Sequence, residues 1–585
     1  LEKSIRVGRS YYLWAQVHHH RGERQSSQFE AHPIGDDGSM PPAFGKILPI
    51  YPLRGSLTQR LIRTNIQSIL AGVDRFIDEL PPVIRERHNL LDTDTAIRTY
   101  HFPSDLSTLE QAQRTLAFTE LFYLQLATRP TKTTRERVLG TSSPTESELS
   151  LIEALPFSLT ADQMHALGEI RSDISSDEPM NRLLQGDVGS GKTLVAWITA
   201  LFSLGRGGQV AFMAPTELLA RQHAEGAATL LAPLGVRLAF LTGSVKAKDR
   251  RLLLEAVANG EVDILIGTHA LFSAEVRFKD LRYVIIDEQH RFGVEQRLAL
   301  LEKATIPDLL LMTATPIPRT LSLTVFGNLD ISTLKTMPAG RKPVITHLVS
   351  EASRSRMYQA VGVEFTRGHQ AYFVYPRIDD TGTDTLRDVT GMYEYLQKQY
   401  PGVPSALMHS RLSEDEKIAI LHAYQKGELS YLVSTSVVEV GIDIPNATCM
   451  IVEHAERFGL SALHQLRGRV GRSTLQSYCF LVFSNELTED AKSRLRVLKE
   501  SNDGFYIAEQ DLLIRGPGEV AGTRQSGYLR LTFASLTEDL ELIQLAREEA
   551  DLILLSEAGL LGSEHTEVRE TLTYAPYFDL STTEL

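Results

Sequence analysis

The chain has 585 residues, of which 43% are hydrophobic and 23% charged, a composition typical of globular proteins. At about 150 residues per domain, this length predicts three or four domains. Two cysteines cannot build a disulfide framework or a four-thiolate zinc site, which favours a cytoplasmic protein. No apolar run approaches the roughly 18–20 residues that span a bilayer, so we expect no membrane partner.

The net charge of −13 is unevenly distributed. Residues 531–585 carry 12 acidic and two basic side chains, so the rest of the chain is close to neutral. Local basic clefts matter more for phosphate binding than total charge does. The acidic balance therefore does not exclude DNA as a partner.

The N-terminal region predicts a small β unit. Residues 11–17 and 28–33 have the composition of short strands, and residues 18–27 between them are predicted as a polar turn. Two strands form a marginal unit at best. We therefore expect them to end a β domain whose earlier strands are absent from this sequence.

Helices are predicted on both sides of the central part of the chain. Residues 58–80 and 106–128 show helical apolar spacing and indicate a helical connector. Near the C-terminus, Leu536, Leu540 and Ile543 recur at helical spacing, which predicts helices that pack against a lobe.

From residue 156 onward, short apolar strands alternate with helices. Continuous apolar runs suit parallel strands that are covered on both faces. The predicted fold class is α/β, with two doubly wound lobes. The predicted strands are residues 183–185, 210–214, 262–267, 283–286, 309–312, 371–375, 432–435, 450–452 and 479–483.

A glycine-rich motif connects the first of these strands to a helix. Its form, G-x-x-x-x-G-K-T, places backbone N–H groups and a helix N-terminus around phosphate oxygens. Lys192 is expected to neutralise β/γ-phosphate charge, and the Thr193 hydroxyl to bind Mg²⁺. The expected nucleotide-binding residues are Gly186, Asp187, Val188, Gly189, Ser190, Gly191, Lys192 and Thr193.

Two carboxylates follow the strand at residues 283–286. Asp287 at a strand end suits Mg²⁺ coordination beside the phosphate loop. Glu288 is expected to orient and deprotonate the attacking water.

The second lobe supplies two arginines, Arg469 and Arg472. Their spacing places both on one face of an expected helix. Planar guanidinium groups can reach a γ-phosphate across a cleft, as arginine fingers do. One phosphate loop with arginines in the other lobe predicts an ATP-driven motor.

Together these motifs resemble those of superfamily 2 helicases and, more closely, of the RecG branched-DNA translocases. Residues 157–163 resemble the adenine-reading Q motif, which implies that Gln163 contacts the base. Residues 287–297 have a DEQH form that RecG shares with the transcription-repair coupling translocase. Segments 214–223, 242–244, 266–269, 313–319, 434–445 and 464–472 are similar to the remaining motifs, and 511–527 to the translocation segment of these two families.

The resemblance implies two RecA-like lobes that use ATP and Mg²⁺ to remodel forks and Holliday junctions in recombination and repair. It implies a monomer, with a single-strand-binding protein as a further candidate partner. Arg524 is expected to transmit hydrolysis to stepping. The residues implied in DNA contact or translocation are Thr216, Arg221, Thr242, Thr268, His269, Thr435, Arg515, Arg524 and Gln525.

The expected domains follow from the same comparison. A remnant of the oligonucleotide-binding wedge precedes the connector and the two lobes, and a translocation hairpin with helices ends the chain. The expected bounds are residues 1–50, 51–145, 146–345, 346–500 and 501–585.

Two alternative functions remain open at this point. One is a coupling-factor translocase that pushes RNA polymerase, although no large polymerase-binding domains precede the connector. The other is a non-catalytic branched-DNA module with an ATP switch, against which the complete set of catalytic residue types argues.

Overall fold

The computed structural model describes most of the chain, and its contacts divide the chain into two compact units. One unit comprises residues 1–127 with 530–585, and the other comprises residues 128–529. No helix in the described ranges is both long and apolar enough to cross a bilayer. The described residues are 8–15, 18–20, 23–25, 29–34, 46–53, 57–127, 142–243, 245–288, 307–314, 329–338, 341–376, 384–409, 411–435, 444–484, 487–515, 531–535, 539–554, 560, 562 and 565–574.

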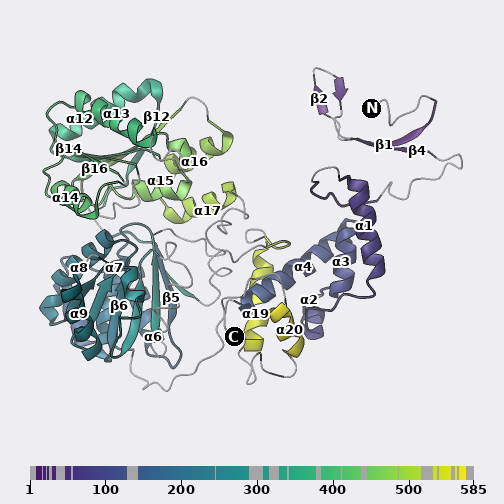
Figure 1. Cartoon of the computed structure of the whole chain (residues 1–585), viewed down its shortest axis with the longest axis horizontal. Coiled ribbons are helices and arrows are strands. Elements are labelled where there is room, and N and C mark those ends of the chain that lie inside the picture. The colour runs from purple at the N-terminus through teal and green to yellow at the C-terminus, as the bar shows by residue number, and fades with distance from the viewer. Residues whose placement is uncertain are drawn as a thin grey trace. The chain divides into compact units, whose positions relative to one another are not determined.

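The first lobe of the larger unit is built on a seven-stranded parallel sheet, with strand order β11-β5-β10-β9-β6-β8-β7 (Figure 1). Helices α6, α7 and α8 cover one face of this sheet, and α9 covers the other. The strands are β5 (Asn181–Gly186), β6 (Gln209–Met213), β7 (Leu238–Leu241), β8 (Ile264–Gly267), β9 (Leu281–Ile286), β10 (Asp308–Thr313) and β11 (Asp330–Leu334). The helices are α5 (Glu146–Ala154), α6 (Ala161–Ile174), α7 (Lys192–Gly205), α8 (Glu217–Leu231) and α9 (Ala247–Asn259).

The second lobe has a six-stranded parallel sheet, with strand order β12-β17-β16-β13-β15-β14. Helices α14 to α17 cover one face, and α12 and α13 cover the other. The strands are β12 (Ile345–Ser350), β13 (Gln370–Val374), β14 (Ser405–Met408), β15 (Tyr431–Ser434), β16 (Ala447–Val452) and β17 (Tyr478–Phe483). The helices are α12 (Arg354–Thr366), α13 (Asp384–Gln399), α14 (Glu414–Gln425), α15 (Leu460–Arg467), α16 (Glu489–Glu500) and α17 (Gly504–Arg515).

Both sheets are buried on both faces, which confirms the prediction of two doubly wound α/β lobes. In β6, Val210 and Phe212 pack into one core, while Ala211 and Met213 pack into the other. All five residues of β6 are buried, as expected for a central parallel strand.

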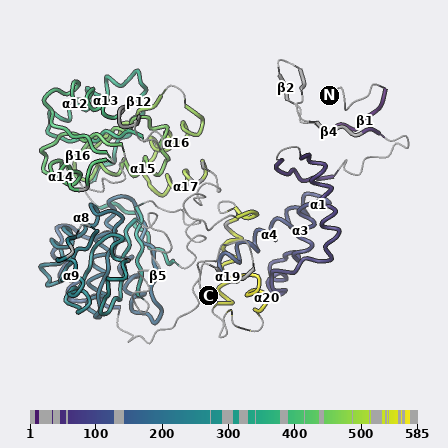
Figure 2. Tube along the Cα trace, viewed as in Figure 1, coloured from purple at the N-terminus to yellow at the C-terminus, as the bar shows by residue number. Residues whose placement is uncertain are grey.

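The smaller unit is mainly helical and centres on α4 (Leu106–Ala127). This helix is buried on almost every side over its second half and packs against α3 and α19 (Figures 1 and 2). The prediction that the C-terminal helices pack against a lobe was therefore wrong for α19. The other helices are α1 (Gln59–Gly72), α2 (Pro82–His88), α3 (Thr93–His101), α19 (Leu540–Leu554) and α20 (Thr566–Tyr574).

Helix α1 ends eight residues before the bound that the apolar spacing predicted, and side chains of α3 explain why. The guanidinium of Arg98 donates to the backbone carbonyls of Leu70 and Val73 at the end of α1. Asp94 accepts the backbone N–H of Phe76 at 3.1 Å. These bonds satisfy backbone groups that a continued helix would have paired internally.

The predicted polar turn over residues 18–27 was also wrong. Strands β2 (His18–His20) and β3 (Glu23–Gln25) form an antiparallel pair there. The two predicted strands are confirmed as the antiparallel pair of β1 (Tyr11–Ala15) and β4 (Phe29–Pro33). Backbone pairing needs no apolar side chains, so residue patterns miss such short strands. The interpretation as a wedge remnant stays a prediction.

A buried carboxylate fixes the C-terminal segment of the smaller unit. Glu120 of α4 is 1% exposed and accepts the backbone N–H groups of Thr532, Phe533 and Ala534, at 2.5, 2.9 and 2.9 Å. Hydrogen bonds to a charged acceptor are roughly twice as strong as neutral ones. Glu120 therefore anchors the chain directly after the expected translocation segment.

Glu120→Ala is expected to lower the free energy of opening of this segment by about 3 kcal/mol, because three backbone donors lose their acceptor. Hydrogen exchange at residues 531–535 in the full chain measures the change. Glu110→Ala, at an exposed position on the same helix, is the matched control and should change exchange little. Unaltered exchange in Glu120→Ala would contradict the anchoring role.

Candidate functional site

The phosphate-binding loop connects β5 to α7. Gly189 and Gly191 have φ angles of +79° and +89°, in the left-handed region that favours glycine. The loop ends at the N-terminus of α7, whose unpaired N–H groups and dipole favour anions. The strand–loop–helix setting expected from the sequence is therefore present.

Lys192 is the first residue of α7 and is buried under this loop. Its Nζ donates to the carbonyl oxygens of Gly186 at 2.7 Å and Asp187 at 2.9 Å. Burial lowers the pKa of Lys192, although the nearby charges of Glu288 and Asp287 oppose that effect. The ammonium group thus lies between the loop and the carboxylates.

Asp287 follows β9 and is held by two neighbours. Its backbone N–H donates to the carbonyl of Met213 in β6 at 2.9 Å, and its Oδ2 lies 2.9 Å from Nε2 of His223 in α8. Burial opposes ionisation of Asp287, but the His223 bond and the Lys192 charge hold the pKa of this carboxyl below its ordinary value. The charged form of Asp287 is therefore favoured in spite of its burial.

Glu288 differs from Asp287 in both backbone and charge. Its φ is +52°, an uncommon conformation for a residue with a Cβ, and one that clusters at functional sites. Burial, and then the charge of Asp287, raise the pKa of Glu288. Neighbouring carboxylates whose pKa values move apart are typical of acid–base sites.

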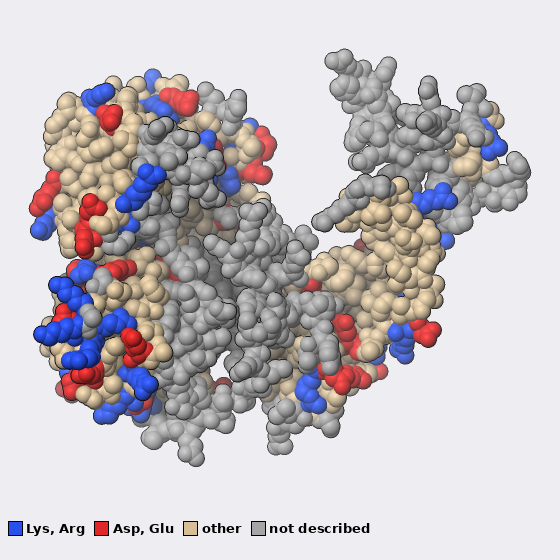
Figure 3. Space-filling model, viewed as in Figure 1, with Lys and Arg blue, Asp and Glu red and all other residues tan. Residues whose placement is uncertain are grey.

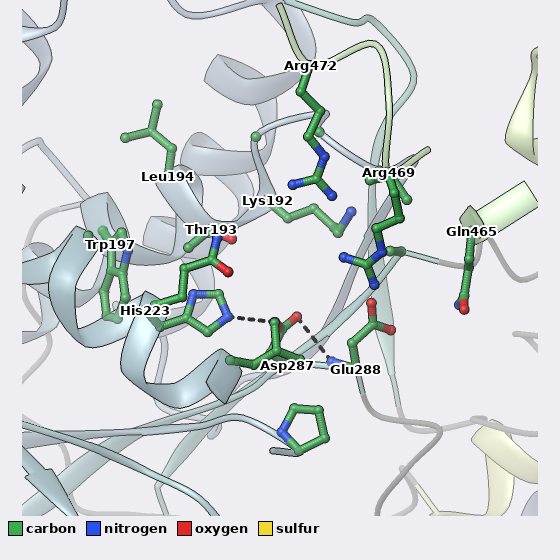
Figure 4. Close-up of a pocket in the computed structure, with 18 of the residues that line it drawn as sticks. Lys192, Thr193, Leu194, Trp197, His223, Asp287, Glu288, Gln465, Arg469 and Arg472 are labelled. Carbon is green, nitrogen blue, oxygen red and sulfur yellow. Dashed lines mark hydrogen bonds and ion pairs between the residues drawn. The ribbon is translucent and has the colours of Figure 1, made fainter. Parts of the chain in front are cut away.

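A cavity of about 390 Å³ brings these groups together with the second lobe. Figure 4 shows Arg472 beside Lys192, and Arg469 beside Glu288. The lining residues include Val188, Gly189, Gly191, Lys192, Thr193, Trp197, His223, Asp287, Glu288, Gln465, Arg469 and Arg472. Both expected arginines therefore face the cavity that the phosphate loop opens into.

The arginines do not lie on a helix, contrary to the expected placement. Helix α15 ends at Arg467, and the chain then turns through Gly471, whose φ is +76°. Nε of Arg472 donates to the carbonyl of Gly468 at 3.3 Å. A loop brings both guanidinium groups to the cavity where one helix face was expected to do so.

Four of the expected nucleotide residues do not line this cavity. Gln163 accepts the Thr160 N–H at 2.8 Å and donates to the Ser190 carbonyl at 2.9 Å, so it joins α6 to the loop. The others are Gly186, Asp187 and Ser190, which belong to the loop framework. The Asp187 carboxylate instead accepts from His464 of the second lobe at 2.8 Å.

The residues fit a nucleoside triphosphate. The cavity has the volume of a small-molecule site and combines a lysine, two arginines and two carboxylates. Ser190 Oγ is buried and has no hydrogen-bond partner among the described residues. The positive φ angles of Gly189 and Gly191 let the loop take the conformation that turns backbone N–H groups toward an anion.

Three of the expected DNA-contacting residues lie at the carboxyl ends of strands in the first sheet. Thr268 directly follows β8, Thr242 directly follows β7, and Thr216 lies shortly after β6. These three strands are neighbours in the sheet. The expected nucleotide-binding residues follow β5 and β9, which flank β10, and the expected DNA-contacting residues follow β6, β8 and β7. Because all strands of this sheet are parallel, both sets of residues lie at the carboxyl ends of the strands.

The other expected DNA residues have varied surroundings. Arg221 of α8 lies over the Phe240 ring at 5.3 Å, and His269 is exposed at the start of a short 3₁₀ helix. Thr435 follows β15 of the second sheet, and Arg515 ends α17. Arg524 and Gln525 lie outside the described residues, so their expected roles have no structural account.

No individual role was expected for three residues that the structure brings to the site, although His223 and His464 lie in segments that resemble helicase motifs. His223 lies seven residues after Thr216, the N-cap of α8, and therefore on the same helix face. Trp197 lies four residues after Thr193 on α7, and it stacks on Phe212 with ring centroids 4.4 Å apart. His464 bonds to Asp187. Helical spacing was the available signal for the first two.

Three protein families match successive parts of the chain. Residues 160–324 match the DEAD/DEAH box helicase family, and residues 354–474 match the helicase conserved C-terminal domain. Residues 501–571 match domain 3, C-terminal, of the ATP-dependent DNA helicase RecG.

Similar proteins cover nearly the whole chain. An ATP-dependent DNA helicase RecG of Treponema pallidum is 49% identical over 543 residues, 88% of this chain and 79% of that relative. The Bacillus subtilis RecG is 40% identical over 584 residues, 99% of this chain and 84% of that relative. A solved structure of RecG bound to a three-way DNA junction aligns at a TM-score of 0.69 with 38% identity, covering 91% of this chain and 70% of that one. On the combined strength of the fold, the two-lobed cavity and these matches, the chain belongs to the RecG family of ATP-dependent DNA helicases, within helicase superfamily 2.

Proposed function

We propose that this chain hydrolyses ATP to move along duplex DNA and thereby remodels branched DNA such as forks and Holliday junctions. The observation that carries the proposal is a single cavity lined by the phosphate loop of one lobe and by Arg469 and Arg472 of the other. Because one chain supplies both halves of this cavity, a monomer suffices for hydrolysis. The solved RecG structure with a three-way junction supports a branched substrate.

Lys192 and the loop backbone are the proposed triphosphate-binding groups. Lys192 can give up its hydrogen bonds to the two loop carbonyl oxygens and donate instead to β/γ-phosphate oxygens, which carry more negative charge. Thr193 and Asp287 are the proposed ligands of Mg²⁺, which when bound neutralises phosphate charge and orients the γ-phosphoryl group. His223 keeps the Asp287 carboxylate oriented.

Glu288 is the proposed residue that positions and deprotonates the attacking water. Its raised pKa brings its basicity closer to that required at neutral pH. Arg469 and Arg472 are the proposed donors to the charge that spreads over the transferring phosphoryl group. Since they belong to the second lobe, hydrolysis and phosphate release change how the lobes attract each other.

The surface at the carboxyl ends of β6, β8 and β7 is the proposed binding site for the DNA backbone. Basic residues Lys246, Lys248 and Arg251 are exposed on or beside α9, soon after Thr242. Figure 3 shows Lys and Arg side chains gathered, with some acidic ones, over this lobe. Phosphate contacts predict weak dependence on base sequence and steep loss of binding with salt. Thr435, Arg515, Arg524 and Gln525 remain proposed contacts from the resemblance.

A cytoplasmic setting completes the proposal, since Cys449 and Cys479 are both free and buried thiols. Contact with a single-strand-binding protein stays a prediction of the resemblance.

The test is ATP hydrolysis by this chain on a model fork, a plain duplex and a single strand of equal length. We expect the fork to stimulate most strongly, with ATP-dependent movement of the branch point. Equal stimulation of hydrolysis by the fork and the plain duplex would still indicate a duplex translocase, but it would refute a preference for branched DNA. No hydrolysis on any substrate would refute the motor and favour a binding module.

A further inference from the structure

The second residue of the phosphate loop makes a contact that nucleotide binding alone does not require. Oδ1 of Asp187 lies 2.8 Å from Nε2 of His464, a residue of α15 that is 4% exposed. The same oxygen accepts the Val188 N–H at 2.7 Å. The loop of the first lobe is thus bonded directly to a helix of the second lobe.

Arg467 decides which nitrogen of His464 carries the proton. A guanidinium N–H of Arg467 lies 3.0 Å from Nδ1 of His464. Arginine can only donate, so Nδ1 must accept, and the ring proton must be on Nε2. In that tautomer, Nε2 of His464 donates to Asp187. Burial opposes ionisation of Asp187, but this bond helps to hold the pKa of the carboxyl below its ordinary value.

Arg467 extends the hydrogen-bonded chain to the end of α16. Its guanidinium donates to the carbonyl oxygens of Leu498 at 2.7 Å and Ser501 at 2.8 Å. Arg467 itself is 3% exposed. An unbroken series of hydrogen bonds therefore runs from the phosphate loop through α15 to the residues that precede α17.

Gly504, the first residue of α17, lies against the Asp187–His464 pair. A Cβ at this position would lie 2.8 Å from Nε2 of His464 and 2.9 Å from Oδ2 of Asp187, distances that real Cβ atoms do not show. A second close contact lies beside it, because a Cβ on Gly468 would lie 2.9 Å from Cβ of Val188. Residues 187–188 therefore pack closely against the start of α17 and the end of α15, so a shift toward these helices would displace one or both of them.

We propose that His464 is a positioning residue that couples the phosphate loop to α17, through its bonds to Asp187 and Arg467 and its contact with Gly504. This role rests on the proposed function, because α17 leads into the expected translocation segment. Packed, fully hydrogen-bonded groups transmit a displacement because they cannot deform continuously.

The experiment is hydrogen exchange of the peptide covering residues 498–507, with and without a non-hydrolysable ATP analogue and Mg²⁺. We expect the analogue to change exchange in the wild-type chain. In His464→Ala, the change in exchange that the analogue causes should be about tenfold smaller, as expected for loss of a typical coupling free energy. Binding of a fluorescent ATP analogue should stay close to wild type, because His464 does not line the cavity.

His464→Gln is the informative rescue variant. The glutamine amide has an acceptor and a donor at about the separation of the two ring nitrogens, so it can accept from Arg467 and donate to Asp187. We expect His464→Gln to restore most of the response. If His464 acted only through apolar packing, its hydrogen bonds would not matter, and the His464→Gln variant would not regain the exchange response that His464→Ala loses. His422→Ala, at an exposed histidine of α14, is the matched control and should respond as the wild type does.

A wild-type response in His464→Ala, or no response in the wild-type chain, would overturn the proposal. If His464→Ala does not fold, Gly504→Ala gives the same readout from the α17 side, and an unchanged response there would overturn it equally. The measurement uses neither DNA nor turnover. A chain that fails to move branched DNA therefore refutes the proposed function without affecting this result.

Discussion

Glu288→Gln is expected to lower the turnover number for ATP by about 10³-fold, within the range for loss of a general base. The substitution keeps the size and hydrogen-bonding shape of the side chain but removes its basicity. Because Glu288 lines the cavity beside Arg469, the amide can still occupy the same place. The dissociation constant for a fluorescent ATP analogue should therefore change little.

This separation of turnover from binding is the discriminating readout. Loss of an interaction made only in the transition state lowers the turnover number without weakening nucleotide binding. Glu225→Gln, at an exposed glutamate of α8, is the matched control and should retain wild-type turnover. Equal loss of binding and turnover in Glu288→Gln would indicate that Glu288 supports the loop and is not the base.

Arg472→Ala is expected to reduce the turnover number by about 10³-fold or more, the range measured for arginine fingers. Arg472 reaches the cavity from the second lobe and lies beside Lys192 in Figure 4. Its guanidinium is proposed to bind charge that develops on the transferring phosphoryl group. We expect the same direction for Arg469→Ala.

Arg472→Lys tests the geometry of this interaction. Lysine keeps the positive charge but lacks the planar fork that can bridge two oxygens, so it should restore only part of the rate. Arg356→Ala, at an exposed arginine of α12, is the control for general loss of charge from this lobe. Full activity in Arg472→Ala under saturating ATP would exclude the finger role.

Helix and strand positions could be predicted from the sequence where burial leaves a clear pattern. In the two lobes, the nine predicted strands correspond to β5, β6, β8, β9, β10, β13, β15, β16 and β17, all of them in the interior of the two sheets. The four lobe strands without a prediction are β7, β11, β12 and β14, which are the edge strands of the two sheets. An edge strand is covered on fewer sides, so its sequence is mixed; β12, for example, alternates between exposed and half-buried positions over its first four residues.

The catalytic residue types were also accessible from the sequence, because phosphate chemistry demands them in a fixed local order. Lys192, Asp287 and Glu288 lie in motifs whose strand–loop context can be recognised without tertiary structure. Membership in the RecG family follows from the same motifs and their order, and the comparisons confirm it.

Only the tertiary structure decided which of these residues meet and which do not. It turned the Asp187 carboxylate toward His464, brought His223 to Asp287, and placed Arg469 and Arg472 on a loop instead of a helix. It also paired α19 with α4, although more than 400 residues separate them. Local sequence patterns depend on neighbours along the chain, whereas these contacts depend on how distant elements pack, which no local spacing specifies.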